Sequence, residues 1–322
     1  MPSSFYYIIH HIMIHRLKNK YGPDRLQAMK RYFLTLASHF LILIIPILLF
    51  SMAHGKDFNE MESLYKPLID RLSQDGFDAE FLSKLMADPR SESIQAVMTI
   101  SLNSGENRER YSQFLSPESI HLSKKFLRQN LKILRKAENR FHVEKEVAVS
   151  ILLVESRFGE NIGKYRVIPT LASMALIGSP ENLQKNYSNL RETDPELSYE
   201  WVENLAKRKA EWAYHELKCF LDIIRHEKID PLEVYGSTAG AFGMAQFIPS
   251  SYLAYAHALN KNSFENWLLG KEEAIFSIGN YLRSHGWKKN LPIKKKKQVL
   301  WYYNRSEPYV ETILKVAQKI KQ

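Results

Sequence analysis

The chain has 322 residues, of which 45% are hydrophobic and 12% aromatic, which excludes a disordered chain and suffices for a sizeable core. Its formal charge of +10 favours an anionic partner, such as nucleic acid, a lipid surface or an acidic polymer like the cell wall. The single cysteine, Cys219, cannot form an intramolecular disulfide, so we expect no disulfide framework.

An apolar run at residues 32–52 follows Lys30 and Arg31 near the start of the chain. The run contains one histidine and no other acidic or basic residue. Such a run is typical of an export signal or a membrane anchor. We therefore assign residues 1–53 to targeting. We predict that residues 54–322 are periplasmic, and that residues 32–52, if retained, associate the protein with the inner membrane.

The choice between signal and anchor depends on where translation starts. A start at Met29 gives a short signal that ends in the small residues Ser51 and Ala53, which favours cleavage, whereas a start at Met1 favours an anchor.

The charge of the chain is lower without the targeting segment. Residues 1–53 hold six of the 45 basic and one of the 35 acidic residues, so residues 54–322 have 39 basic and 34 acidic residues and a formal charge of +5. Export and this modest charge both oppose a nucleic-acid partner.

Helical periodicity dominates the chain after the targeting segment, and no strand of convincing length is predicted. Apolar stripes at helical spacing lie at 64–72, 81–86, 127–134 and 200–226. The polar segment 181–198 between two such regions is interpreted as an inserted loop. The predicted fold class is therefore mainly α.

Glu155 is the first candidate for chemistry, in the sequence VAVSILLVESRFG at 147–159. Helical spacing places Ala148, Ile151 and Leu152 on the same face as its carboxyl group. A carboxyl group among apolar residues loses hydration, so we expect its pKa to rise and the group to serve as a general acid. The alternative is a structural glutamate paired with a distant Arg or Lys.

A glycine-rich segment, GSTAGAFGMAQFIPSSY, occupies residues 236–252. It lacks the Gly-Lys-Ser/Thr of a phosphate-binding loop and follows no predicted strand, so a nucleotide site is not expected. Ser237 and Gln246 offer neutral hydrogen-bonding groups. Apolar faces come from Phe242, Met244 and Phe247. This mixture suits a sugar site, and the alternative is a glycine-rich turn that precedes a helix.

Aromatic residues cluster again in WYYNRSEPYV at 301–310, and could form a second wall for stacking on sugar rings. Packing in the core would explain some of these aromatics equally well. No group of His, Cys and Asp in the sequence has the spacing of metal ligands.

These segments, taken in this order, resemble the membrane-bound lytic murein transglycosylase B family, glycoside hydrolase family 103. The motifs that carry the resemblance are ILLVESRFGENIGKYRVIPTLASMAL at 151–176, GSTAGAFGMAQFIPSSY at 236–252, SIGNYLRSHGW at 277–287 and YNRSEPYV at 303–310. The resemblance implies a lysozyme-like helical core with additional helices. It divides the enzyme domain into an N-terminal helical part at 54–140 and a catalytic core at 141–322.

The resemblance also implies roles for single residues. The catalytic acid of the family matches Glu155. Its substrate-contacting residues match Ser237, Gln246, Tyr281, Tyr303 and Tyr309, and we add Phe247, the neighbour of Gln246. The implied substrate is the glycan strand of peptidoglycan, cut between N-acetylmuramic acid and N-acetylglucosamine with formation of a 1,6-anhydro sugar. One carboxyl group suffices, because the nucleophile is the C6 hydroxyl of the substrate.

Two other functions remain open from the sequence. A muramidase would use water on the same bond, and a non-catalytic protein would only bind peptidoglycan.

The chain also departs from the family in two places. The stretch that corresponds to the calcium loop, 257–265, contains one acid, so we predict no calcium and no other cofactor. Glu181 and Asn182 replace a basic pair of the family, which leaves recognition of the stem peptide open.

Overall fold

The computed structural model describes residues 63–100, 108–226, 229–257 and 270–321, all of which belong to one compact unit. The predicted targeting segment, 1–53, lies outside the described residues. Within these ranges, no helix is long and apolar enough to cross a bilayer. The predicted fold class is confirmed, because helices account for nearly all of the regular structure.

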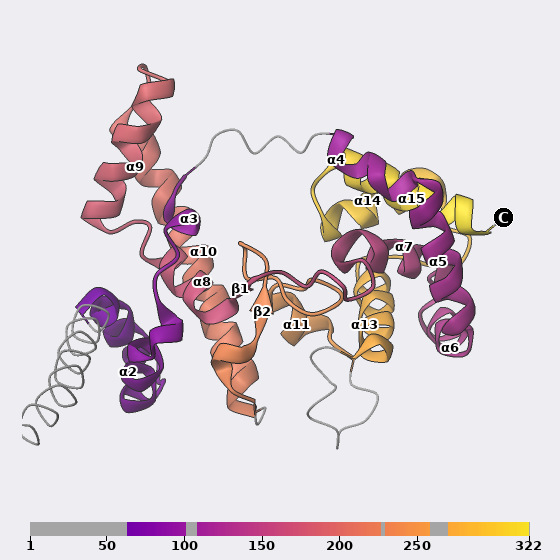
Figure 1. The fold of residues 1–322 in the computed structure, drawn as a ribbon, viewed down its shortest axis with the longest axis horizontal. Coiled ribbons are helices and arrows are strands. Elements are labelled where there is room, and N and C mark those ends of the chain that lie inside the picture. The colour runs from indigo at the N-terminus through magenta and orange to yellow at the C-terminus, as the bar shows by residue number, and fades with distance from the viewer. Residues whose placement is uncertain (1–62, 101–107, 227–228, 258–269, 322) are drawn as a thin grey trace, which may run out of the picture. The chain divides into compact units, whose positions relative to one another are not determined.

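One group of helices is built around α8 and α10, which pack against each other (Figure 1). Its members are a helix over 63–74, α2 (Ala79–Ala87), η1 (Pro89–Ser91), α3 (Gln95–Met98), α8 (Val167–Ala175), α9 (Pro180–Thr193) and α10 (Tyr199–His226). Arg71 joins the first helix to α10 through a bidentate bond to Glu211, with N–O distances of 2.6 and 2.8 Å.

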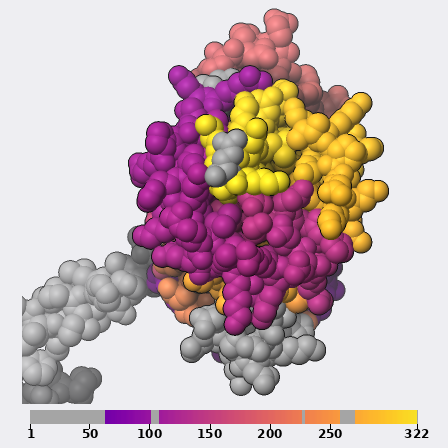
Figure 2. Space-filling model, turned by 90° about the vertical axis from the view of Figure 1, so that its right-hand side faces the viewer, coloured from indigo at the N-terminus to yellow at the C-terminus, as the bar shows by residue number. Residues whose placement is uncertain are grey.

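A second group surrounds α7, which contacts α5, α6, α13 and α15. Its members are α4 (Arg108–Ser112), η2 (Gln113–Leu115), α5 (Pro117–Gln129), α6 (Leu131–Phe141), α7 (Lys145–Ser156), α13 (Lys271–Ser284), α14 (Ile293–Tyr303) and α15 (Glu307–Lys321). In Figure 2 the purple surface of α4 and α5 adjoins the yellow surface of α15, consistent with the contacts between these helices.

A short connecting region holds the only strands of the described residues. They are β1 (Tyr165–Arg166) and β2 (Tyr235–Gly236), which form an antiparallel ribbon in which Tyr165 pairs with Gly236. The same region contains η3 (Pro231–Glu233) and α11 (Pro249–Tyr255), and α11 contacts both α10 and α13. The largest hydrophobic core runs through both groups, with members such as Leu72, Leu217, Leu152 and Ile313.

Helix starts follow local signals in the sequence. Asp78 accepts a hydrogen bond from the backbone N–H of Phe81 at 2.6 Å and so caps α2. Ser116 accepts from the N–H of Ser119 at the start of α5, where Pro117 occupies the first turn. These caps satisfy N–H groups that have no partner within the helix.

The interpretation of 181–198 as an inserted loop is wrong, because residues 180–193 form α9. The buried side chains of this helix are Leu183, Asn186 and Leu190, spaced by three and four residues, and they face a small core of their own. The rest of the helix is mainly polar. The apolar stripe is therefore narrow, and the polar composition of the segment led to the prediction of a loop.

The start of α11 depends on a carboxylate from α10. Glu216 is 2% exposed, and its two oxygens accept hydrogen bonds from the N–H and the hydroxyl of Ser250, at 2.9 and 2.8 Å. We expect Glu216→Ala to lower the free energy of unfolding by about 2–3 kcal/mol, because the partly buried N–H and hydroxyl of Ser250 lose their partner and the buried Glu216 side chain is removed. Urea unfolding measures this change. Glu203→Ala, which removes an exposed pair with Lys207, serves as control and should cost about 0.5 kcal/mol.

Candidate active site

Glu155 lies in the last turn of α7, a helix whose residues from 146 to 153 are all buried. Ala148, Ile151 and Leu152, predicted to share its face, are in the core, whereas Glu155 itself is partly exposed. Its side chain lines a pocket of about 220 Å³. The residues around this pocket are Arg110, Tyr111, Gln113, Phe114, Val154, Glu155, Asn304 and Tyr309. The carboxyl group therefore stands where a buried helix opens onto a polar cavity.

The backbone after Glu155 turns sharply, which ends α7 at this point. Arg157 and Phe158 both have a positive φ, at 49° and 62°, and Gly159 follows at 93°. The hydroxyl of Ser156 donates to the carbonyl of Met244 at 2.7 Å. The end of α7 is thereby fixed to the glycine-rich segment.

Arg157, the cation nearest to Glu155 in the sequence, is engaged elsewhere. Its guanidinium pairs with Glu118 at 2.7 Å and with Glu160 at 3.1 Å. These two carboxylates hold the arginine on the outside of α5 and α7.

Tyr309 contacts the carboxyl group of Glu155 directly. The Tyr309 hydroxyl donates a hydrogen bond of 2.6 Å to Oε1 of Glu155, although the two residues lie 154 positions apart. Burial, and then the nearby negative charge of Glu155, raise the pKa of Tyr309 well above its usual value of 10. The hydroxyl is therefore neutral at physiological pH and acts as a donor to the carboxylate.

Three further predicted residues continue from Tyr309 as an aromatic cluster. The ring of Tyr303 stacks on Tyr309 at 6.3 Å, and Tyr281 and Phe247 contact Tyr303 at 4.9 and 5.8 Å. The Tyr303 hydroxyl donates to the carbonyl of Ala245 at 2.6 Å, and the Tyr281 hydroxyl donates to that of Tyr302 at 2.7 Å. Burial raises the pKa of Tyr281 to about 12.

The structure thus joins Glu155, Tyr309, Tyr303, Tyr281 and Phe247 through successive contacts. Phe247, Tyr281 and Tyr309 are almost fully buried. Their side chains pack against residues beside the pocket and expose little surface that a sugar could contact. Direct contact of Tyr303 or of these three residues with substrate stays a prediction.

Ser237 and Gln246 hold the glycine-rich segment in shape. The Ser237 hydroxyl accepts hydrogen bonds from the N–H groups of Ala239 and Ala241, both at 3.2 Å. The Gln246 amide donates to the carbonyls of Ile162 and Gly243, at 3.0 and 2.8 Å. Gln246 is next in the chain to Ala245, the partner of Tyr303. A substrate contact of Ser237 or Gln246 remains a prediction.

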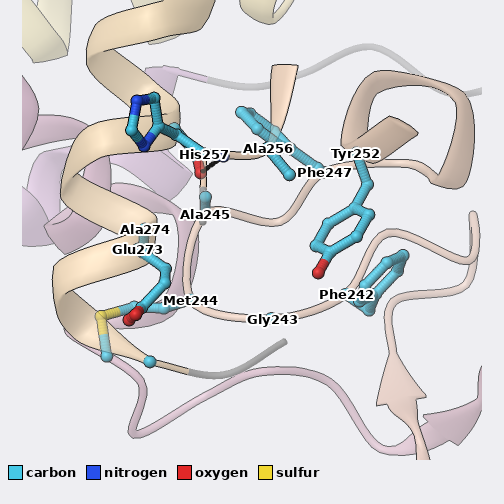
Figure 3. Close-up of a pocket in the computed structure, with 12 residues that line it drawn as sticks. Phe242, Gly243, Met244, Ala245, Phe247, Tyr252, Ala256, His257, Glu273 and Ala274 are labelled. Carbon is cyan, nitrogen blue, oxygen red and sulfur yellow. Dashed lines mark hydrogen bonds between the residues drawn. The ribbon is translucent and has the colours of Figure 1, made fainter. Parts of the chain in front are cut away.

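The same segment lines a second pocket, which shares no lining residue with that of Glu155. Figure 3 shows this pocket, with the rings of Phe242 and Tyr252 beside each other at 5.1 Å. Its volume of about 20 Å³ is room for a water molecule and excludes a sugar ring. The described residues contain no group of three or more His, Cys, Asp and Glu able to hold a metal ion. Most of the stretch for which we predict no calcium, 258–265, lies outside the described residues.

One wall of the Glu155 pocket was missed by sequence reasoning. Arg110, Tyr111, Gln113 and Phe114 come from α4 and η2, and they precede Glu155 by more than forty residues. No local pattern in that short segment indicates a site. Asn304 lies inside the aromatic segment at 301–310, and its place between Tyr303 and Tyr309 could have suggested it.

Tyr309→Phe tests the contact with Glu155. We expect glycan cleavage to fall about tenfold with an unchanged fold, because phenylalanine keeps the ring packing and loses only the charge-assisted hydrogen bond. A donor stabilises the ionised carboxylate, so its loss should move the alkaline limit of activity to higher pH. The pH–rate profile measures both effects. Tyr302→Phe is the control, because Tyr302 is 59% exposed, and an equal loss in both variants would contradict the assigned role.

Comparison with known proteins places this site in a family. Residues 60–298 match the family described as the transglycosylase SLT domain, and the chain belongs to this family. The chain is 30% identical over 249 residues to membrane-bound lytic murein transglycosylase B of Escherichia coli (strain K12). That match covers 74% of this chain and 61% of the relative, so the chain spans less than two thirds of the relative's length.

Solved structures of lytic transglycosylases share the fold. Soluble lytic transglycosylase SltB1 from Pseudomonas aeruginosa matches with a TM-score of 0.62 and 22% identity, over 81% of this chain and 98% of that chain. Escherichia coli Slt35 in complex with bulgecin A matches with a TM-score of 0.63 and 23% identity, over 80% and 92%. Pseudomonas aeruginosa SltB3 in complex with NAG-anhNAM-pentapeptide matches with a TM-score of 0.63 and 18% identity, over 82% of this chain and 79% of that chain. The predicted lysozyme-like fold is confirmed.

Proposed function

We propose that the protein is a lytic transglycosylase that cleaves the bond between N-acetylmuramic acid and N-acetylglucosamine in peptidoglycan and leaves 1,6-anhydro ends. The observation that carries the proposal is the pocket of Glu155. Among the described residues that line it, Glu155 is the single carboxylic acid, and a neutral Tyr309 hydroxyl donates to it. A mechanism with one carboxyl group fits this arrangement. Family membership and the SltB3 complex with an anhydro sugar support the same reaction.

In this mechanism Glu155 first acts as acid. It gives its proton to the glycosidic oxygen as the bond between that oxygen and C1 of the muramic acid breaks. The acetamido carbonyl of the same sugar stabilises the charge that develops at C1. The C6 hydroxyl then attacks C1, a bond forms between O6 and C1, and the hydroxyl proton returns to the Glu155 carboxylate. Tyr309 holds that carboxylate in place through both steps.

The alternative of a hydrolytic muramidase requires a group that activates water. Glycosidases that use water commonly carry a second carboxylate near the first, and no other acid lines the described pocket. Mass spectrometry of digested sacculi separates the possibilities. We expect products with anhydro ends. Products with reducing ends would show that the protein is a muramidase. If no soluble product is released, the protein only binds peptidoglycan.

We further propose that the protein is exported to the periplasm by residues 1–53 and acts on glycan strands there, without nucleic acid as a partner. The apolar run at 32–52 and the membrane-bound relative in Escherichia coli support this location. Fractionation of cells that produce the tagged full chain tests it. Recovery in the cytoplasmic fraction would contradict export.

A further inference from the structure

We propose that Arg110 is a specificity residue that binds a carboxylate carried by the muramic acid of the substrate, on its lactyl group or on the stem peptide joined to that group. This inference rests on the proposed function and concerns the same pocket. It predicts that the enzyme prefers strands whose carboxylates are free over strands in which they are neutralised.

The first argument is the placement of charges in the pocket. Arg110 comes from α4, Glu155 comes from α7, and both line one cavity of about 220 Å³. Arg110 is the single basic residue among the described residues that line it. The remaining walls are neutral: Tyr111, Gln113, Phe114, Val154, Asn304 and Tyr309.

The second argument is that the guanidinium of Arg110 is available. It forms no ion pair and donates no side-chain hydrogen bond within the described part of the chain. Arg108, two residues earlier in the same helix, lies 3.8 Å from Glu311. Arg157, at the end of α7, is held by Glu118 and Glu160. Arg110 thus differs from these two arginines, because within the described residues its donors are directed to no carboxylate.

The third argument is electrostatic. A glycan strand that enters the pocket brings the lactyl arm of the muramic acid close to the scissile bond, and carboxylates on that arm are repelled by an ionised Glu155. An arginine in the same cavity offsets this repulsion and can bind a carboxylate in bidentate fashion. The positive charge of Arg110 in the pocket therefore complements the negative charge of an anionic sugar.

The test compares three soluble substrates: strands with intact stem peptides, the same strands with all carboxyl groups converted to amides, and strands stripped by an amidase so that only lactyl carboxylates remain. We expect the wild-type full-length protein to show about tenfold higher kcat/KM on intact than on amidated strands, mostly through KM. Arg110→Ala should cleave both at nearly the same rate, and Arg110→Lys should recover part of the preference. Arg108→Ala is the matched control and should behave as wild type.

The stripped strands separate the two sources of the carboxylate. A preference for them over amidated strands that depends on Arg110 assigns the contact to the lactyl group, and a preference confined to intact strands assigns it to the stem peptide. An Arg110→Ala variant that keeps the wild-type preference, or loses activity equally on all strands, would overturn the inference while leaving the proposed function in place. A wild-type protein without turnover on any strand would instead overturn the proposed function. Circular dichroism and thermal melting verify that each variant is folded.

Discussion

Replacement of Glu155 by glutamine is expected to reduce glycan cleavage by at least about a hundredfold, the usual scale for loss of a general acid. Glutamine has nearly the same shape, and its carbonyl can still accept the hydrogen bond from Tyr309. The amide has no proton to give to the glycosidic oxygen and cannot take one from the C6 hydroxyl. Release of soluble fragments from labelled sacculi measures the loss.

A matched control for this variant is Glu160→Gln. Glu160 lies five residues further along the chain, is exposed, and contacts Arg157. Its replacement should leave the rate within about twofold of wild type, since an exposed ion pair contributes little. Equal activity of wild type and Glu155→Gln, with both folded, would show that another residue transfers the proton.

Gly163→Ala is expected to lower the free energy of unfolding by at least about 3 kcal/mol. Gly163 has a φ of 100°, and a methyl group there would lie 2.0 Å from the carbonyl oxygen of Gly236. That oxygen belongs to the ribbon strand β2, so the clash cannot be relieved by rotation of a side chain. Gly163 also follows Ile162, whose carbonyl accepts the amide of Gln246. Urea unfolding measures the loss.

Gly286→Ala is the control that separates backbone strain from the clash. Gly286 has a similar φ of 96°, but no atom lies within 4 Å of the position of its added methyl group. Only the strain of a left-handed conformation remains, at about 1 kcal/mol. Similar losses in the two variants would show that the close approach of Gly236 does not limit stability.

The helices were largely predictable because their buried faces recur at helical spacing. The stripe at 200–226 became α10, and the apolar segment around Glu155 became α7. The stripe at 127–134 is one exception, because Asn130 separates α5 from α6 there. The side chain of Asn130 donates to the carbonyl of Phe126, a local bond that competes with continuation of the helix.

The candidate site was predictable only in the parts that carry recognisable motifs. The resemblance singled out Glu155, Tyr303 and Tyr309, but the contact of Tyr309 with the Glu155 carboxylate required the structure. The wall from α4 and η2 was not predictable, because its position depends on packing against α15. Periodicity describes which face of a helix is buried and gives no information about which distant helix covers it.

The glycine-rich segment couples parts of the site that are far apart in the chain. The carbonyls of two consecutive residues, Met244 and Ala245, accept hydrogen bonds from this site. Met244 accepts from the hydroxyl of Ser156, which follows Glu155 in the chain, and Ala245 accepts from the hydroxyl of Tyr303, on which Tyr309 stacks. A displacement of this short backbone stretch would therefore act on the acid and on its hydroxyl donor simultaneously. An insertion that strained this segment would therefore affect the Glu155 carboxylate both through Ser156 and through the Tyr303–Tyr309 pair.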